Sequence, residues 1–227
     1  MAPVKIAILA SGSGTTAERF ITDCVNGRVA GDVVLVIANN KNAQVFDRVA
    51  KLNNKHGLDI KTANIGKSTH PPKDNEEVEY GHQTSAEEQA ILKELKSAGI
   101  DLVLLLGYMK LVGKSIVEKY GWRDDYMSVY QARMLNTHPG LLPATKGLFG
   151  IHVQERVIAG KLEAGHCLFA VDSEYDDGPV IAEHKVQVDK EDTPESLFER
   201  VKDSEKIHLA EDINGFIVEQ KKYMGVE

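Results

Sequence analysis

The sequence contains few cysteines and no long apolar run. Cys24 and Cys167 are its two cysteines, and neither lies in a paired motif. They predict no disulfide framework and indicate a reducing compartment. No stretch approaches the ~20 apolar residues that cross a bilayer. Because the first residues also lack the segments of a secretion signal, we expect a cytoplasmic protein with no membrane partner.

Basic residues are outnumbered by acidic ones. The chain has 27 Lys and Arg residues against 34 Asp and Glu residues, a net charge of −7. Proteins that coat nucleic acid carry an excess of Lys and Arg, so we expect no nucleic-acid partner. A local basic pocket for one phosphate is compatible with this balance. Small-molecule substrates are therefore the expected partners.

Several catalytic motifs are also missing. The chain has no G-x-x-x-x-G-K-[ST] segment, which excludes a P-loop, and no Ser or Cys lies on a nucleophile turn. His138, His152, His166 and His184 are isolated in the sequence, without metal-ligand spacing. We therefore expect no metal and no covalent enzyme intermediate. The nucleophile should come from a substrate.

Apolar runs alternate with helical segments through the first part of the chain. This alternation predicts an α/β fold, with a Rossmann-like, mostly parallel twisted sheet and helices on both faces. We expect strands at residues 4–9, 33–38, 58–65, 101–106, 134–136, 167–171 and 180–188. We expect helices at residues 15–25, 43–52, 86–98, 115–120 and 153–158, and a long final helix capped by Thr193 with Pro194 in its first turn.

No repeat or low-complexity tract divides the chain, so residues 1–227 are expected to form one domain. Residues 66–83 contain Pro71-Pro72, several charges and no apolar period. This segment is expected to be a surface loop or insertion.

A glycine-rich turn follows the first predicted strand. Gly12-Ser13-Gly14-Thr15-Thr16 lies between that strand and a helix, where free N–H groups face an anion. With Ala17 the segment also fits the relaxed dinucleotide pattern G-x-G-x-x-A. NAD binding needs an acid near the end of the second strand, but that strand ends in Ala38-Asn39-Asn40-Lys41. The turn therefore favours a monophosphate, and a plain strand–helix turn is the alternative.

Asn136 and His138 lie two residues apart at the end of a predicted strand. On extended backbone they point the same way, toward the edge where open α/β sheets bind ligands. An amide donor and an imidazole suit stabilisation of a developing oxyanion, and the imidazole can move a proton near neutral pH. The alternative is a strand-end histidine bonded to a backbone carbonyl.

An acidic turn, Glu174-Tyr175-Asp176-Asp177, precedes the next strand. One of its carboxylates can pair with His138 and raise the pKa of the imidazole, or the turn can simply be solvated.

A glutamate interrupts the apolar stripe of the last helix. Glu205 lies on the face of Val201 and Leu209, where a carboxylate is costly unless it is paired or functional. It is either the partner of a basic side chain, a polar edge of the stripe, or an acceptor for sugar hydroxyls.

Four motifs in order resemble the phosphoribosylglycinamide formyltransferases (GAR transformylases) of the formyltransferase superfamily, over about residues 4–217. The motifs are Leu9-Ala10-Ser11-Gly12-Ser13-Gly14-Thr15-Thr16, Leu105-Leu106-Gly107-Tyr108-Met109-Lys110, Leu135-Asn136-Thr137-His138-Pro139-Gly140-Leu141-Leu142-Pro143 and Asp176-Asp177-Gly178-Pro179-Val180-Ile181. The resemblance implies transfer of a formyl group from 10-formyltetrahydrofolate, a co-substrate, to the amine of 5-phosphoribosylglycinamide in purine biosynthesis.

The resemblance also implies roles for individual residues. It assigns catalysis to Asn136, His138 and Asp176. It divides the domain into a phosphate-binding half, residues 1–110, and a catalytic and folate-binding half, residues 111–227. The implied ribonucleotide-binding residues are Gly14, Thr15, Thr16 and Glu205. The implied folate-binding residues are Met109, Lys110, Leu111, Val112, Asn136, Asp172 and Asp176.

The implied mechanism is direct attack by the amine on the formyl carbon. Asn136 and protonated His138 would stabilise the oxyanion. Asp176 would orient His138, raise its pKa and help relay a proton. The resemblance leaves open whether the chain is a monomer or a homodimer.

Three features depart from the family pattern. Phe169 stands where a histidine is common, Asp177 stands where glycine is usual, and residues 66–90 contain no arginine. These departures leave two alternatives: a formyltransferase acting on another amine, and a non-catalytic folate- or nucleotide-binding homologue. Formyltetrahydrofolate hydrolase and methionyl-tRNA formyltransferase rank lower because they usually carry an additional domain, and a dehydrogenase is disfavoured by the missing acid.

Overall fold

A computed structural model describes residues 3–225 of the chain. One sheet of seven strands runs through it in the order β3-β2-β1-β4-β5-β6-β7. The strands are β1 (Val4–Ala10), β2 (Gly31–Ala38), β3 (Lys61–Asn64), β4 (Leu102–Leu105), β5 (Met134–His138), β6 (Ala164–Ala170) and β7 (Val180–Val186). The first five pair in parallel, while β6 and β7 are antiparallel. The predicted mostly parallel α/β sheet is confirmed.

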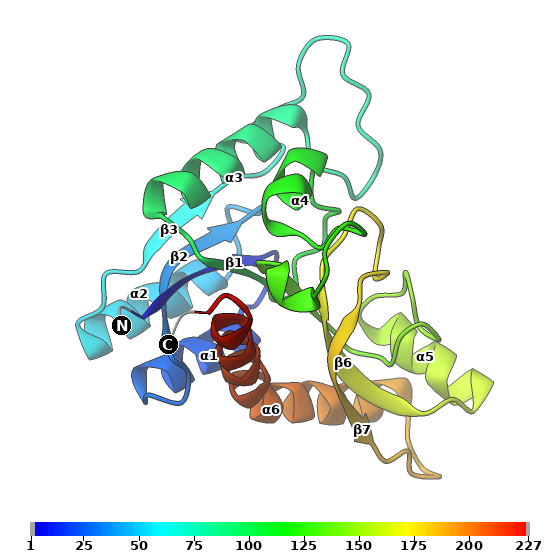
Figure 1. The fold of residues 1–227 in the computed structure, drawn as a ribbon. Helices are drawn as coiled ribbons and strands as arrows, with labels where there is room; N and C mark the ends of the chain where they lie inside the picture. The colour runs from blue at the N-terminus through cyan, green and yellow to red at the C-terminus, as the bar shows by residue number, and fades with distance from the viewer. Residues whose placement is uncertain (1–2, 226–227) are drawn as a thin grey trace.

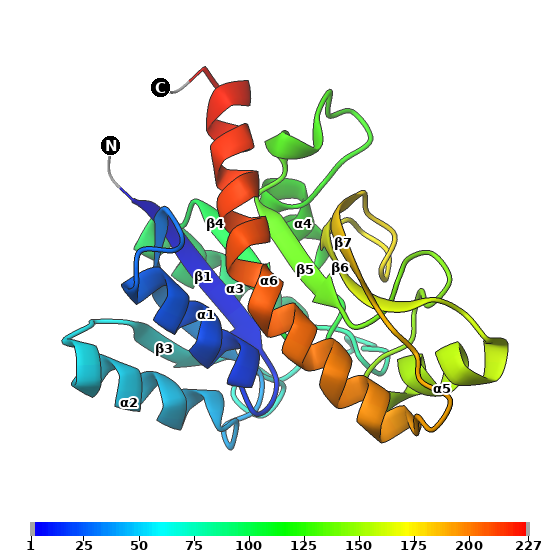
Figure 2. The same cartoon turned by 90° about the horizontal axis from the view of Figure 1, so that it is seen from below.

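Helices cover both faces of this sheet (Figure 1). On one face lie α3 (Ser85–Ala98) and α4 (Lys114–Tyr120). On the other lie α1 (Thr15–Val25), α2 (Val45–His56) and α6 (Pro194–Tyr223), and α5 (Ile151–Gly160) packs near the β6–β7 edge. Each predicted helix and strand is present, with shifted ends, and a short 3₁₀ helix at Val129–Gln131 was not predicted. Figure 2 shows α6 running across the sheet beside α1.

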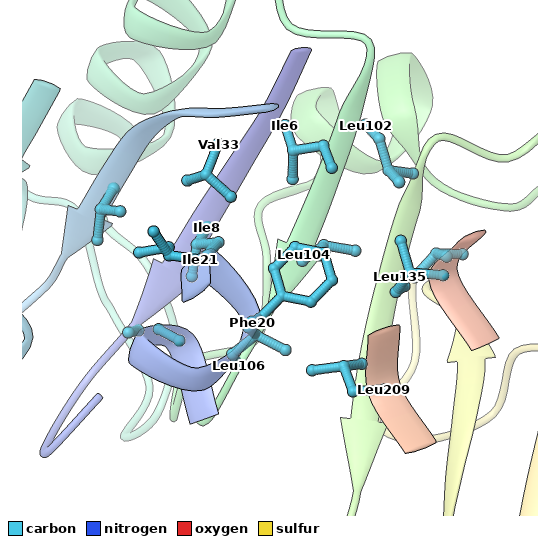
Figure 3. Packing of buried hydrophobic residues seen from close by; sticks show 14 of the residues in the cluster. Ile6, Ile8, Phe20, Ile21, Val33, Leu102, Leu104, Leu106, Leu135 and Leu209 are labelled. Carbon is cyan, nitrogen blue, oxygen red and sulfur yellow. The ribbon is translucent and has the colours of Figure 1, made fainter. Parts of the chain in front are cut away.

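The core consists of two apolar layers that share the central strands. In β4, Leu102 and Leu104 face α1 and α6, whereas Val103 and Leu105 face α3 and α4. Side chains alternate across a strand, so a strand buried on both faces must be apolar throughout. Figure 3 shows the first layer, where Phe20 of α1 packs among the strand residues. Burial of each such large side chain contributes about 1.5–3 kcal/mol to folding.

The strand order places a crevice at one edge of the sheet. β1 lies between β2 and β4, and the chain leaves β1 toward α1 on one face and leaves β4 toward α4 on the other. In open α/β sheets, ligands bind at such a switch point, outside the carboxyl ends of the strands. The glycine turn after β1, the segment after β4 and the end of β5 therefore meet at this edge.

Local signals set the helix ends as expected. The Thr193 hydroxyl accepts a hydrogen bond from the Ser196 N–H at 3.2 Å, and Pro194 opens α6. Residues 66–83 form a long connection without a helix or strand of the sheet, as predicted, and project from the body in Figure 1. Among residues 3–225, no helix has the length and apolar character required to cross a membrane.

Candidate functional site

The glycine turn is shaped by one positive backbone angle. Gly14 caps α1 with φ 69°, and a Cβ atom there would lie 2.5 Å from the Val45 side chain. Only glycine fits such a position without strain. The Ser13 carbonyl accepts a hydrogen bond from Arg48 at 2.7 Å, and the Ser11 hydroxyl accepts one from the Met109 N–H at 2.9 Å. These contacts fix the turn, and the first N–H groups of α1 are left facing the crevice for an anion.

The predicted polar centre forms at the end of β5. Asn136 and His138 line the same cleft, and the Asp176 carboxylate approaches from the loop between β6 and β7. The His138 Nδ1 atom lies 3.6 Å from Asp176 Oδ2. The structure therefore brings together the three residues, and of the two neighbouring acids Asp176 is the one that faces the histidine.

A threonine fixes the orientation of the imidazole. His138 Nε2 lies 3.0 Å from the Thr145 hydroxyl, which donates its own proton to the Leu141 carbonyl at 3.0 Å. Because the hydroxyl has only one proton, Nε2 must be the donor. The other ring nitrogen, Nδ1, therefore faces Asp176. Nothing in the sequence marked Thr145, because its role depends on the turn that returns it beneath β5.

The pKa of His138 is lowered, whereas a raised pKa and a protonated ring were predicted. Burial lowers it below its ordinary value, and this effect outweighs the opposing influence of Asp176 and of the Thr145 hydrogen bond. His138 is only 3% exposed. Asp176 does raise the pKa, as expected, but the low-dielectric surroundings penalise the charged ring more strongly. The imidazole is thus poised to be neutral near pH 7 and to accept a proton.

Glu205 joins the glycine turn to the polar centre. Its carboxylate accepts a hydrogen bond from the Thr16 hydroxyl at 3.1 Å and is buried beside Thr137 of β5. Burial raises the pKa of Glu205, while hydrogen bonds from these two threonines oppose the rise. No basic side chain neutralises it at hydrogen-bond distance among the described residues, so the carboxylate keeps acceptor capacity toward the cleft.

The segment after β4 forms another wall of the cleft. Met109, Lys110, Leu111 and Val112 all line it. The Lys110 ammonium, however, binds both oxygens of the buried Glu87 carboxylate, at 2.6 and 2.7 Å. Lys110 therefore presents its backbone and carbon chain to the cleft rather than a free charge.

Two other acids of the β6–β7 loop, Asp172 and Asp177, do not line the cleft. The Asp172 carboxylate accepts a hydrogen bond from the Glu174 N–H at 3.0 Å, and burial raises its pKa. Asp177 forms an ion pair with Lys146. This pairing occupies the carboxylate that replaces the glycine expected there, and Asp176 rather than Asp177 faces His138.

The glycine turn, Asn136, His138, Asp176, Glu205 and the segment after β4 surround one cleft of about 630 Å³. This volume lies within the ~300–1,000 Å³ range of small-molecule and cofactor sites. Sequence reasoning missed several of its residues. Lys202 lies one helical turn before Glu205, a spacing that places both on one face of α6 and provides a signal for it. The other missed lining residues include Tyr80, Thr137, Phe149 and Phe198.

Comparison with known proteins identifies the family. The model of the formyl transferase family matches residues 4–213. The chain belongs to the formyl transferase family. It is 32% identical to the chloroplastic phosphoribosylglycinamide formyltransferase of Arabidopsis thaliana, over 96% of this chain and 66% of that protein. It is 28% identical to the phosphoribosylglycinamide formyltransferase of Bacillus subtilis, over 87% of this chain and 86% of that protein.

Solved structures of the same family share the fold. The phosphoribosylglycinamide formyltransferase of Bacillus halodurans superposes with a TM-score of 0.75 at 31% identity, covering 94% of this chain and 95% of that one. The glycinamide ribonucleotide transformylase of Geobacillus kaustophilus gives a TM-score of 0.75 at 28% identity, covering 93% of this chain and 97% of that one. The α/β formyltransferase fold is therefore confirmed.

Phe169 is a core residue of this formyl transferase. It pairs with Asn136 across β5 and β6, is almost fully buried and forms part of the cleft lining. An aromatic ring at this place makes the wall beneath Asn136 apolar. The phenyl ring of Phe169, unlike a histidine ring, offers no proton acceptor at this position.

Two histidines that are isolated in the sequence lie together in the folded chain. His166 and His184 are not isolated in space: they pair across β6 and β7, and their rings stack at 4.9 Å between centroids. His208 of α6 stacks on His184 at 3.9 Å. Antiparallel pairing brings together residues eighteen positions apart, which sequence spacing does not reveal. Among residues 3–225, no group of three or more His, Cys, Asp or Glu side chains has an arrangement suited to a metal ion.

Proposed function

We propose that this formyl transferase moves a formyl group from 10-formyltetrahydrofolate to the amine of 5-phosphoribosylglycinamide, a step of purine biosynthesis. One observation carries the proposal: a single cleft joins a glycine-turn anion site to an amide, an imidazole and a carboxylate. The relatives named phosphoribosylglycinamide formyltransferase support the choice of amine.

The ribonucleotide end of the cleft suits a sugar phosphate. The N–H groups at Gly14, Thr15 and Thr16 supply donors for a phosphate at the start of α1. Lys202 of α6 also lines the cleft, with its ammonium bound to the Glu199 carboxylate at 2.9 Å. The buried Glu205 carboxylate accepts hydrogen bonds, which suits ribose hydroxyls and disfavours a second anion.

The folate end of the cleft suits a flat heterocycle with an apolar body. Met109, Leu111 and Val112 form an apolar wall, and Phe169 forms part of the lining. These residues would hold the folate, together with the loop that carries Asp176. The folate supplies an activated formyl carbon. The amine must then reach that carbon beside Asn136.

The chain's own groups handle charge and protons at the centre. The Asn136 amide donates to the oxygen that gains negative charge. His138, with its pKa lowered by burial, accepts the proton that the attacking amine must lose. Asp176, at 3.6 Å, stabilises the positive charge that then develops on the imidazole. The bond between the formyl carbon and the folate nitrogen then breaks, and the proton held on His138 passes to that leaving nitrogen, so the imidazole is neutral again at the end of the cycle. This assignment replaces the expected protonated His138 with a neutral one that becomes charged during the reaction.

The test is an assay of the purified protein with both substrates, with the formylated ribonucleotide detected by mass spectrometry. We expect product that depends on both substrates and that His138→Ala abolishes. Transfer to another amine but not to this one would reject the substrate. Binding of both compounds without turnover would reject catalysis and favour a binding protein.

A further inference from the structure

The Tyr175 hydroxyl joins three segments at the mouth of the cleft. It donates a hydrogen bond to the Gly81 carbonyl at 3.0 Å and accepts one from the Leu111 N–H at 3.1 Å. The same N–H also approaches the Gly81 carbonyl at 2.8 Å. Tyr175 belongs to the β6–β7 loop, whereas Gly81 and Leu111 belong to the facing wall. One phenol thus links the two walls of the cleft.

The facing wall leaves room for this phenol. Gly81 has φ 81°, and a Cβ atom there would lie 3.0 Å from the Tyr175 hydroxyl oxygen. The His82 ring lies 6.2 Å from the Tyr175 ring, at 53°. Burial raises the pKa of Tyr175, so the phenol keeps its proton and remains a donor at neutral pH. A side chain at position 81 would push the hydroxyl away from both of its partners.

Tyr175 immediately precedes the acid of the polar centre. Asp176 has φ 50°, an unusual angle for a residue other than glycine, so its carboxylate is not placed by a relaxed extended backbone. Its Oδ2 atom accepts a hydrogen bond from the Gly147 N–H at 3.1 Å and lies 3.6 Å from His138. The turn is therefore held on one side by Gly147 and on the other by the Tyr175 phenol.

We propose that Tyr175 is a positioning residue whose hydroxyl fastens the β6–β7 loop to the Gly81–Leu111 wall and thereby holds the Asp176 carboxylate against His138. The inference rests on the proposed function, because it assigns Tyr175 a role in the reaction through Asp176. Without the hydroxyl, the loop loses both bonds to the facing wall. The strained turn at Asp176 then relaxes, and the carboxylate spends less time beside the imidazole.

A double-mutant cycle on the purified enzyme tests this role. Tyr175→Phe keeps the ring and removes the hydroxyl, and we expect kcat to fall roughly three- to tenfold, the size typical of losing a hydrogen bond. The KM for 5-phosphoribosylglycinamide should not change, since its phosphate site is at Gly14. In an Asp176→Asn background, Tyr175→Phe should have almost no further effect. Equal fold losses in both backgrounds would overturn the proposal.

Hydrogen exchange provides a measurement that does not depend on turnover. In Tyr175→Phe, backbone amides of residues 109–113 and 172–178 should exchange faster than in the unsubstituted protein. Tyr126→Phe is the matched control, because Tyr126 packs on Trp122 and Arg123 away from the cleft. Unchanged exchange in Tyr175→Phe would overturn the inference. Faster exchange without turnover of the unsubstituted protein would support the link between the walls and reject the proposed function alone.

Discussion

Two buried histidines of this protein differ in what lies beside them. His138 is 3% exposed and His166 is 2% exposed. His138 faces the Asp176 carboxylate, which opposes the effect of burial on its pKa. His166 faces His184 and His208, and its Nε2 atom forms a hydrogen bond with the Ser204 hydroxyl at 3.0 Å. Burial and these two histidines lower the pKa of His166 to about 3.

The difference shows what makes a buried histidine useful. Burial alone removes the ring from titration near neutral pH, because the charged form loses its hydration. A nearby carboxylate offsets part of the lost hydration energy of the charged ring, so the pKa falls less and the ring can still take up a proton. His166, His184 and His208 form a histidine cluster. There Asp212 binds His184, with both carboxylate oxygens 3.0 Å from Nε2. We therefore expect His138 to serve chemistry and His166 to serve packing.

The largest effect should come from removing the imidazole of the cleft. His138→Ala is expected to lower kcat by about 10²- to 10⁴-fold, because the acceptor of the amine proton is lost. Its circular dichroism spectrum should match that of the unsubstituted protein. His166→Gln is the matched control and should retain most turnover. A similar loss of kcat in both variants would contradict the distinction between the two histidines.

Removing the acid should have a smaller effect and move the pH profile. Asp176→Asn is expected to lower kcat roughly ten- to hundredfold, since the charged imidazole loses its nearby carboxylate. Asp176 raises the pKa of His138, so the acidic limb of the pH profile of kcat/KM should move to lower pH in this variant. An acidic limb that stays in place, or moves upward, would show that Asp176 does not act on His138.

The histidine cluster should make stability depend on pH. The folded pKa of His166 is about 3, against an ordinary value of 6.5 for an exposed imidazole, so between these pH values the unfolded chain binds more protons. Stability should therefore rise from pH 3 to 6.5, with this group contributing up to ~1.4 kcal/mol per pH unit. Denaturant titrations at several pH values give the free energy of unfolding at each pH. This free energy should rise less steeply with pH in His166→Gln than in the unsubstituted protein. The same dependence of the free energy of unfolding on pH in both proteins would exclude His166 as the cause of that dependence.

The smallest expected effect separates binding from stability at Glu205. The folded pKa of Glu205 is raised, so stability falls as pH rises through that folded value, because the folded state must release a proton it holds more tightly. Glu205→Gln removes the ionisable group and with it this loss of stability, so the variant should be more stable by about 1 kcal/mol at pH 7. The KM for the ribonucleotide should rise. A destabilised variant with unchanged KM would show that the carboxylate is structural.

Particular residues show how far sequence reasoning reached. Apolar runs that alternate with helical segments predicted the parallel sheet, because strands buried on both faces must be apolar. Gly14 marked a turn that only glycine fits. Asn136 and His138 were found through the two-residue period of a strand. Thr145 was missed because nothing local links it to His138.

Residues close together in the chain were enough to predict the strand–helix alternation, the glycine turn at Gly14, the helix cap at Thr193 and the carboxylate of Glu205 within an apolar stripe. The folded chain was needed to show that Asp176 faces His138 while Asp177 binds Lys146, and that burial outweighs the acid in setting the pKa of His138. Those outcomes depend on distances and burial between segments far apart in sequence, which exist only once the sheet order has brought the loops together.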